Sequence, residues 1–208
     1  MNSIMIRKIY KRDYRGYEKI PKRRTGKEIQ LLKYSKQKDR DIIRRYLMED
    51  FNSKCVYCGW QNTSYSDSVF HIEHTKSKSK NGELIDDYQY LALACPVCNC
   101  SKNNKEVDYY IDPIDPDFQK LFYRNKYGAI VVNKKLSIEE TKLAEAYLKM
   151  IGLHKELYKI DYVYGSLNKI LHSEMELEKK DCLLIVQILE IIHFIDRVAR
   201  RKTNYTDF

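Results

Sequence analysis

Apolar residues recur at helical spacing in two regions of the chain, residues 38–51 and residues 137–200. An apolar stripe with a period near 3.6 residues is typical of a helix that packs one face against a core. In the first region the stripe comprises Ile42, Ile43, Tyr46, Leu47 and Phe51. The pattern therefore predicts a helix over 38–51 that ends at Asn52 and Ser53.

The second region predicts three helices in succession. Ser137 and Glu140 have the spacing of a capping box, and Gly152 suits the end of the first helix. Between 153 and 171 the apolar positions follow alternating steps of four and three, the spacing of an a/d seam. Residues 181–200 are apolar around most of the helix, except for a narrow polar stripe of Gln187, Glu190, His193 and Asp196.

The last helix must be covered on several sides, and two arrangements satisfy this requirement. The three helices can form a small bundle of their own. Alternatively, the last helix forms an interface with another subunit, because large apolar patches often mark partner surfaces. We expect the second arrangement, in which the last helix contacts another subunit.

Shorter patterns predict strands. Residues 68–74 alternate in part between apolar and polar, and residues 90–94 form a short apolar run. Asn81-Gly82 between them is a turn signal, and Tyr127-Gly128 indicates a hairpin within 111–135.

The order of these elements predicts an α+β chain in three parts. Residues 1–36 are basic and rich in tyrosine, which is typical of an extended arm, here with a short helix at its end. Residues 37–110 form the expected core, and residues 111–208 contain the hairpin and the helical region.

The net charge of +9 is concentrated at one end of the chain. Residues 1–50 hold 16 lysines and arginines against 7 acidic residues, whereas 51–110 hold 6 against 7 and 111–208 hold 16 against 15. A basic segment attracts nucleic acid by releasing counterions, although a solvated basic face is the alternative. The interleaved tyrosines can stack on bases or equally fix the arm to the core: Tyr10, Tyr14, Tyr17 and Tyr34.

Membrane association and disulfides are not expected. No apolar stretch reaches the roughly 18 residues that a bilayer span requires, and the N-terminus lacks a continuous apolar run. We therefore expect a cytoplasmic protein. Six cysteines in such a protein favour metal ligation or packing over disulfides, and Cys100 and Cys182 receive no assigned role.

The other four cysteines form two C-x2-C pairs, Cys55/Cys58 and Cys95/Cys98, separated by 36 residues. Each pair can supply two thiolates from one tight turn, so that together they complete a tetrahedral zinc site. Redox use of either pair is disfavoured because no βαβ pattern surrounds it. Four thiolates leave no open position on zinc, and we therefore expect a structural Zn²⁺.

Residues suited to phosphodiester hydrolysis lie between and after these pairs. His71-Ile72-Glu73-His74 precedes the second pair, and Asn99 and Lys102 follow it. The reaction needs a base for the attacking water and a cation for the phosphoryl charge. We expect His74 as the base, Glu73 and Asn99 as ligands of a catalytic Mg²⁺ or Mn²⁺, and Lys102 as a phosphate anchor. The alternative is that Glu73 and His74 are incidental polar residues on a strand.

Together these residues resemble the HNH nucleases over residues 40–105. The shared pattern is a helix, a C-x2-C pair, an acidic residue before a histidine, and the segment C-x2-C-N-x2-K. The resemblance implies a ββα-metal, treble-clef-like core in which two strands and a helix surround the catalytic metal. It also implies that His74 is the general base, and that Glu73 and Asn99 bind that metal.

A second similarity extends beyond the core. The chain is similar in this respect to HNH proteins of retron-associated and Septu-type antiphage systems. The shared features are the HIEH segment, the Asp-Pro pairs at 112–113 and 115–116, the hairpin and the leucine-rich tail. Those proteins work beside an ATPase. The similarity implies antiphage defence, with the C-terminal helices bound to an ATPase subunit or to a second copy.

Two positions depart from the family pattern. Tyr90 stands where the middle Asn is usual, and Ser77 stands where a Pro is frequent. That Asn normally braces the loop that carries the base, so Tyr90 argues for weaker catalysis.

The sequence thus predicts a metal-dependent endonuclease with DNA as the expected substrate. The cations expected to contact nucleic acid are Lys76, Lys78, Lys102, Arg23 and Arg24. The competing prediction is a zinc-knuckle subunit that binds nucleic acid without cutting it. A binding module needs no base beside a carboxylate, so Glu73, His74 and Asn99 favour the nuclease.

Overall fold

The computed structural model describes residues 13–61, 69–171 and 182–194. In chain order the first elements are α2 (Lys27–Leu31), α3 (Gln37–Asp50), β1 (His71–His74), the 3-10 helices η2 (Gly82–Leu84) and η3 (Tyr88–Tyr90), and β2 (Leu91–Ala94). They are followed by α4 (Pro96–Lys102), α5 (Pro116–Lys120), β3 (Phe122–Arg124), β4 (Ile130–Val132), α6 (Ile138–Ile151), α7 (Glu156–Leu171) and α8 (Cys182–Phe194).

The chain divides into two compact units. The first comprises Met1–Arg124 and Val131–Leu153, and the second comprises Asn125–Ile130 and His154–Phe208. Both boundaries predicted from the sequence, after residues 36 and 110, fall inside the first unit.

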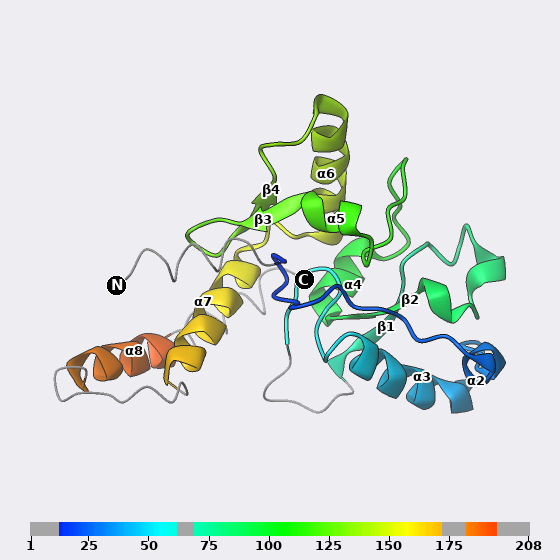
Figure 1. Ribbon diagram of the computed structural model, residues 1–208, viewed down its shortest axis with the longest axis horizontal. Coiled ribbons are helices and arrows are strands. Elements are labelled where there is room, and N and C mark those ends of the chain that lie inside the picture. The colour runs from blue at the N-terminus through cyan, green and yellow to red at the C-terminus, as the bar shows by residue number, and fades with distance from the viewer. Residues whose placement is uncertain (1–12, 62–68, 172–181, 195–208) are drawn as a thin grey trace. The chain divides into compact units, whose positions relative to one another are not determined.

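Two strands and a helix form the centre of the first unit. β1 pairs antiparallel with β2, so that His71 lies opposite Ala94 and His74 lies opposite Leu91. α4 packs against β1, α3 packs against both strands, and the small sheet lies between the two helices (Figure 1). Because both faces are covered, every residue of β2 is buried. The α+β class and its ββα core are therefore confirmed.

The N-terminal segment 13–36 packs onto this unit. Tyr14 and Tyr17 are buried, and their hydroxyls donate to the carbonyl oxygens of Tyr57 at 2.8 Å and of Lys54 at 3.1 Å. The sequence left two roles open for the tyrosines: stacking on bases, or attaching the arm to the core. Tyr14 and Tyr17 have the second role. Tyr10 lies outside the described residues, and α2 is the short helix that was expected.

Local sequence signals set the limits of α6. Ser137 Oγ accepts the N–H of Glu140 at 3.2 Å, and the Glu140 carboxylate accepts the N–H of Ser137 at 2.7 Å. Gly152 ends the helix with φ of 75°, a conformation that is strained for other residues. The capping box and the glycine stop are both confirmed.

The hairpin and the helix before it follow similar rules. β3 and β4 form the two-stranded sheet that Tyr127-Gly128 predicted, and Gly128 has φ of 84°. α5 was not predicted, although its signal is present in the sequence. Asp115 accepts the N–H of Asp117 at 2.8 Å, and Pro116 takes the first helical position.

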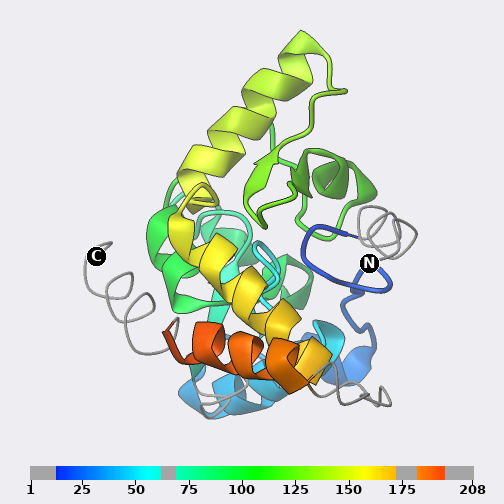
Figure 2. The same ribbon diagram turned by 90° about the vertical axis from the view of Figure 1, so that its left-hand side faces the viewer.

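α7 and α8 form the helical part of the second unit and lie against one another in both views (Figure 1, Figure 2). On α8, Ile188 is buried, whereas other apolar residues are about half exposed: Val186, Leu189, Ile191 and Phe194. Residues 195–200 of the predicted helix lie outside the described residues. Within the described ranges, no helix has both the length and the hydropathy of a membrane span.

Candidate functional site

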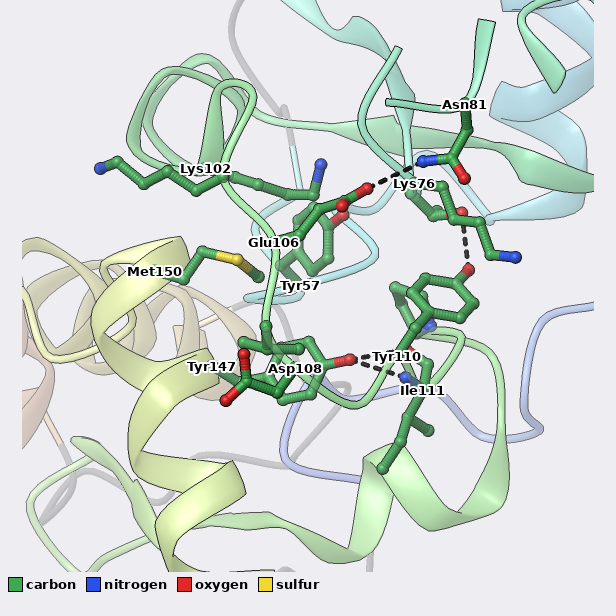
Figure 3. A pocket seen from close by; sticks show the side chains of 14 residues that line it. Tyr57, Lys76, Asn81, Lys102, Glu106, Asp108, Tyr110, Ile111, Tyr147 and Met150 are labelled. Carbon is green, nitrogen blue, oxygen red and sulfur yellow. Dashed lines mark hydrogen bonds between the residues drawn. The ribbon is translucent and has the colours of Figure 1, made fainter. Parts of the chain in front are cut away.

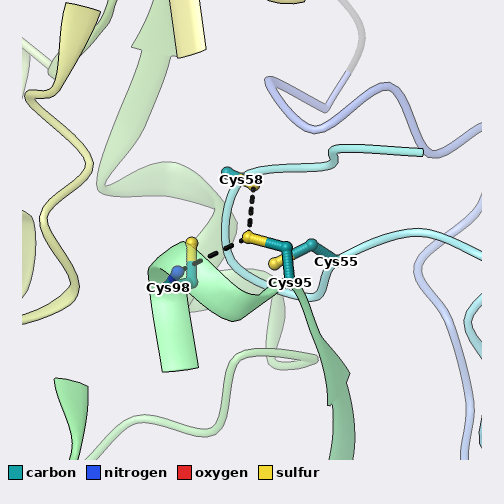
Figure 4. A group of neighbouring side chains, drawn as sticks. All are labelled: Cys55, Cys58, Cys95 and Cys98. Carbon is teal, nitrogen blue, oxygen red and sulfur yellow. Dashed lines mark hydrogen bonds between the residues drawn. The ribbon is translucent and has the colours of Figure 1, made fainter. Parts of the chain in front are cut away.

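Four cysteine side chains converge in the first unit (Figure 4). Cys55 and Cys58 come from the loop after α3, Cys95 follows β2, and Cys98 lies in the first turn of α4. Their sulfur atoms all lie within 4.8 Å of one another, and all four residues are buried. The predicted four-cysteine metal-binding cluster is confirmed.

Backbone turns shape the two cysteine pairs. The N–H of Trp60 donates to Cys58 Sγ at 3.4 Å, and the N–H of Cys98 donates to Cys95 Sγ at 3.4 Å. Gly59 has φ of 75°, and a Cβ there would lie 2.1 Å from the carbonyl oxygen of Arg15. Only glycine therefore fits, and the N–H donors favour thiolate sulfur as a metal ligand.

This donor set fits zinc. Zn–S bonds of about 2.3 Å in a tetrahedron place neighbouring sulfur atoms about 3.8 Å apart. The distance between Cys58 Sγ and Cys95 Sγ is 3.8 Å. Because four thiolates saturate the ion, such a zinc joins the 55–58 loop to β2 and α4 and has no open position for chemistry.

On the face of β1 that meets α4, Glu73 forms a buried ion pair. Its Oε1 accepts from Lys102 Nζ at 2.7 Å and from the Tyr57 hydroxyl at 3.3 Å. Lys102 Nζ also donates to the carbonyl oxygen of His74 at 2.9 Å. Burial raises the pKa of Glu73, while Lys102 acts in the opposite direction.

His74 has a different set of neighbours. Its Nε2 lies 3.0 Å from the carbonyl oxygen of Ile85. Because a carbonyl only accepts, this contact assigns the ring proton to Nε2 and leaves the lone pair on Nδ1. The Tyr34 ring packs edge-on against the imidazole, with centroids 4.5 Å apart. Both the orientation and the tautomer of His74 are therefore fixed.

The protonation state of His74 suits a base. Burial lowers its pKa to about 4, and the positive charges of Lys78 and Lys102 act in the same direction. The imidazole is therefore neutral at pH 7, as a proton acceptor has to be.

The side-chain amide of Asn99 bonds to a third residue of β1, His71. Its Nδ2 lies 2.8 Å from Nδ1 of His71, to which it donates. Burial lowers the pKa of His71, and the charge of Arg44 adds to that effect. A divalent ion at Glu73 would therefore have to displace the Lys102 ammonium, and Asn99 Oδ1 is not the atom that contacts His71.

The loop after His74 has a brace that the sequence did not reveal. The N–H of Thr75 donates to the carbonyl oxygen of Tyr90 at 2.9 Å. Lys76 Nζ lies 4.8 Å from the ring centroid of Tyr90 and 5.0 Å from that of Tyr110. The Tyr110 hydroxyl lies 2.8 Å from Thr75 Oγ1. These contacts leave no local sequence pattern, and Tyr90 takes part in them although it replaces the usual Asn.

Two of the five cations expected to contact nucleic acid lie on this loop. Lys78 is exposed beside the Tyr34 ring, and Lys76 is half-buried between two tyrosine rings. Both lie within four residues of His74 in the chain.

The other three cations are held by protein groups. Arg23 is buried and donates to the Leu91 carbonyl and to both carboxylate oxygens of Asp112. Arg24 is bonded to two acidic residues of α3, and Lys102 is buried against Glu73. Their positive charges are therefore neutralised within the fold, and Arg23 and Lys102 have almost no surface to offer a phosphate.

A pocket of about 250 Å³ adjoins the ion pair. Lys102 and Tyr57 line it together with Tyr147 and Met150 of α6 (Figure 3). Acidic side chains also line it, namely Glu106 and Asp108.

Residues 55–105 match the family model described as HNH endonuclease. The match covers less than half of the chain and spans the cysteine cluster, both strands of the ββα core and α4. It supports a nuclease of the HNH type, and an HNH domain implies nucleic-acid binding. A search of curated proteins found no match to the chain.

Proposed function

We propose that the chain is an HNH endonuclease that hydrolyses phosphodiester bonds of DNA, with His74 as the general base. The observation that carries the proposal is the state of the His74 imidazole. It is neutral and held in one tautomer by Ile85, within the segment that matches the HNH model.

The chain's own groups account for the proton transfer. Nδ1 of His74 takes a proton from the attacking water, and the Ile85 carbonyl stabilises the imidazolium because its hydrogen bond raises the pKa of the ring. The Thr75 N–H bond to Tyr90 fixes the backbone next to the base. Lys76 and Lys78, on the loop after His74, contribute contacts to the phosphate backbone.

A divalent ion, Mg²⁺ or Mn²⁺, completes the proposed chemistry. Family resemblance assigns it to Glu73 and Asn99, where it would neutralise charge on the phosphoryl and leaving oxygens. Carboxylate and amide oxygens are suitable ligands for these ions.

Cleavage by a His74→Ala variant tests the proposal. Zinc-loaded protein is incubated with plasmid DNA and with RNA, over a series of Mg²⁺ and Mn²⁺ concentrations. Loss of a general base lowers the rate by about 10² to 10⁴, whereas DNA affinity measured by fluorescence anisotropy stays the same.

His154→Ala is the matched control, because His154 is exposed and lies in the second unit. It should cleave like the parent. A His74→Ala variant that cuts DNA as fast as the parent would falsify the assignment of the base.

A non-catalytic nucleic-acid-binding subunit is the second candidate. The Glu73–Lys102 ion pair and Tyr90 at the usual Asn position favour it. A parent protein that binds DNA but cuts neither substrate at any Mg²⁺ or Mn²⁺ concentration would support this candidate.

We also propose a setting in antiphage defence, beside an ATPase subunit or a second copy of the chain. The resemblance to retron-associated and Septu-type proteins supports it, as do the exposed apolar residues of α8. Co-expression of the chain with its neighbouring genes, followed by phage challenge, tests the proposal.

A further inference from the structure

The Lys102 ammonium is enclosed by oxygen atoms. It lies 2.7 Å from Glu73 Oε1 and 2.9 Å from the carbonyl oxygen of His74. The two side chains are only 3% and 5% exposed, and lysine is almost never buried so deeply unless it is paired. A carboxylate and a carbonyl oxygen are also the donors that hard divalent cations prefer.

We propose that Lys102 is a built-in cation of this site, and that a divalent ion binds Glu73 only in competition with it. The catalytic role of the divalent ion rests on the proposed function, whereas the competition for Glu73 does not. Two positive charges that share one buried carboxylate repel each other strongly, because the surroundings screen them little. Lys102 therefore leaves when the ion binds.

The pocket gives the displaced side chain a place to go. Lys102 already lines this space of about 250 Å³, together with the carboxylates of Glu106 and Asp108 (Figure 3). An ammonium that leaves Glu73 can therefore reach water and new acidic partners. The move exchanges one carboxylate for another and does not strand a buried charge.

This competition lowers the affinity of the site for metal. When the binding-competent state is only fractionally populated, the apparent dissociation constant rises in proportion. Lys102 thus sets the metal concentration at which the Glu73 site fills. Without metal it keeps the buried Glu73 carboxylate paired.

Direct Mn²⁺ binding to the zinc-loaded chain tests the proposal in the absence of nucleic acid. Free Mn²⁺ is measured by electron paramagnetic resonance for the parent, Lys102→Gln and Lys102→Arg. Glutamine can still donate to Glu73 but carries no charge, so the dissociation constant should fall by at least about tenfold. Arginine keeps the charge and should leave the constant near that of the parent.

Lys105→Gln is the matched control. Lys105 lines the same pocket, but its Nζ donates to the Ser101 carbonyl at 2.9 Å and it is exposed. It should bind Mn²⁺ like the parent, and Lys102→Gln combined with Glu73→Gln should lose the gain. An unchanged constant in Lys102→Gln, or no Mn²⁺ bound by either protein, overturns the proposal.

Lysine acetylation of the parent protein provides a second measurement, which needs no variant to fold. Mass spectrometry follows the labelling rates of Lys102 and Lys105 with and without Mg²⁺. Lys102 should be protected without Mg²⁺ and react several times faster with it, whereas Lys105 should not change. Equal protection of Lys102 in both conditions overturns the proposal. Neither measurement depends on cleavage, so a failure of the proposed nuclease activity is seen separately.

Discussion

At the scale of single residues, Arg15 connects three separate parts of the first unit. Its buried guanidinium pairs with Asp13 at 2.7 Å and donates to the carbonyl oxygens of Val56 at 2.8 Å and Pro113 at 2.6 Å. A basic residue near the N-terminus thus stabilises the core and is not available to nucleic acid.

We expect Arg15→Met to lower the free energy of unfolding by about 3 to 5 kcal/mol, because it leaves the buried Asp13 carboxylate unpaired. Urea denaturation followed by circular dichroism measures the change. Lys120→Met is the control, since Lys120 pairs with Asp117 on the exposed surface and should show no measurable effect. Equal stability of parent and Arg15→Met would contradict the expectation.

Glu106 makes the loop after His74 sensitive to acid. Its Oε1 accepts the N–H of Ser77 at 2.7 Å and the side-chain amide of Asn81 at 3.0 Å. Partial burial acts to raise the pKa of Glu106, but the Ser77 bond and Lys80 outweigh it, so the pKa is lowered. A carboxylate with a lowered folded pKa stabilises the protein above its unfolded pKa near 4.5, and this contribution is lost as the pH falls.

We therefore expect the unfolding free energy of Glu106→Gln to depend less on pH below about 4.5 than that of the parent. The pH-dependent stabilisation that the variant lacks is at most about 1 kcal/mol, because Glu106 is partly exposed. Urea denaturation at a series of pH values measures it. Glu83→Gln changes an exposed carboxylate nearby in the chain and should keep the parent's slope. Identical slopes for all three proteins would show that Glu106 is not involved.

At the scale of elements, the cysteine cluster joins the loop after α3 to the junction between β2 and α4. The 55–58 loop, the end of β2 and the start of α4 meet at the four sulfur atoms. A structural zinc of this kind contributes about 10 to 16 kcal/mol on binding, which is comparable with the whole stability of a domain.

We expect one zinc ion per chain by elemental analysis, and Cys98→Ser to misfold. Cys100→Ser is the matched control, because Cys100 lies two residues further along α4 and is exposed outside the cluster. It should keep both zinc and fold. Well-folded, soluble protein without zinc would contradict this prediction.

At the scale of the whole molecule, α8 carries the evidence on assembly. The apolar pattern of residues 181–200 predicts that charged substitutions at Ile188 and Ile192 would disrupt an interface, but Ile188 is buried and Ile192 is partly covered. The exposed apolar residues Leu189 and Phe194 are better probes.

We expect Leu189→Glu and Phe194→Glu to shift a dimer or complex toward the monomer in analytical ultracentrifugation, with zinc content unchanged. Ile188→Glu should instead unfold the second unit, because it buries a charge. A parent protein that is monomeric, and that recovers no companion from its native cell, would show that the helices satisfy one another.

The sequence alone determined the features that depend on near neighbours. The period of apolar residues placed α3, α6 and α7, and the capping box at Ser137 set the start of α6. The two C-x2-C pairs gave the cluster, because a metal-ligand set is recognisable from residue type and spacing alone. The position of His74 at the end of β1 followed from strand alternation and family resemblance.

Only the tertiary structure decided which partner each charged side chain has. Arg23 pairs with Asp112, 89 residues away, and Lys102 pairs with Glu73 although its spacing suggested a phosphate anchor. Asn99 likewise bonds to His71. Burial makes such pairings obligatory, because an unpaired charge inside the protein is costly. Burial is set by the packing of distant segments, and no local sequence pattern records it.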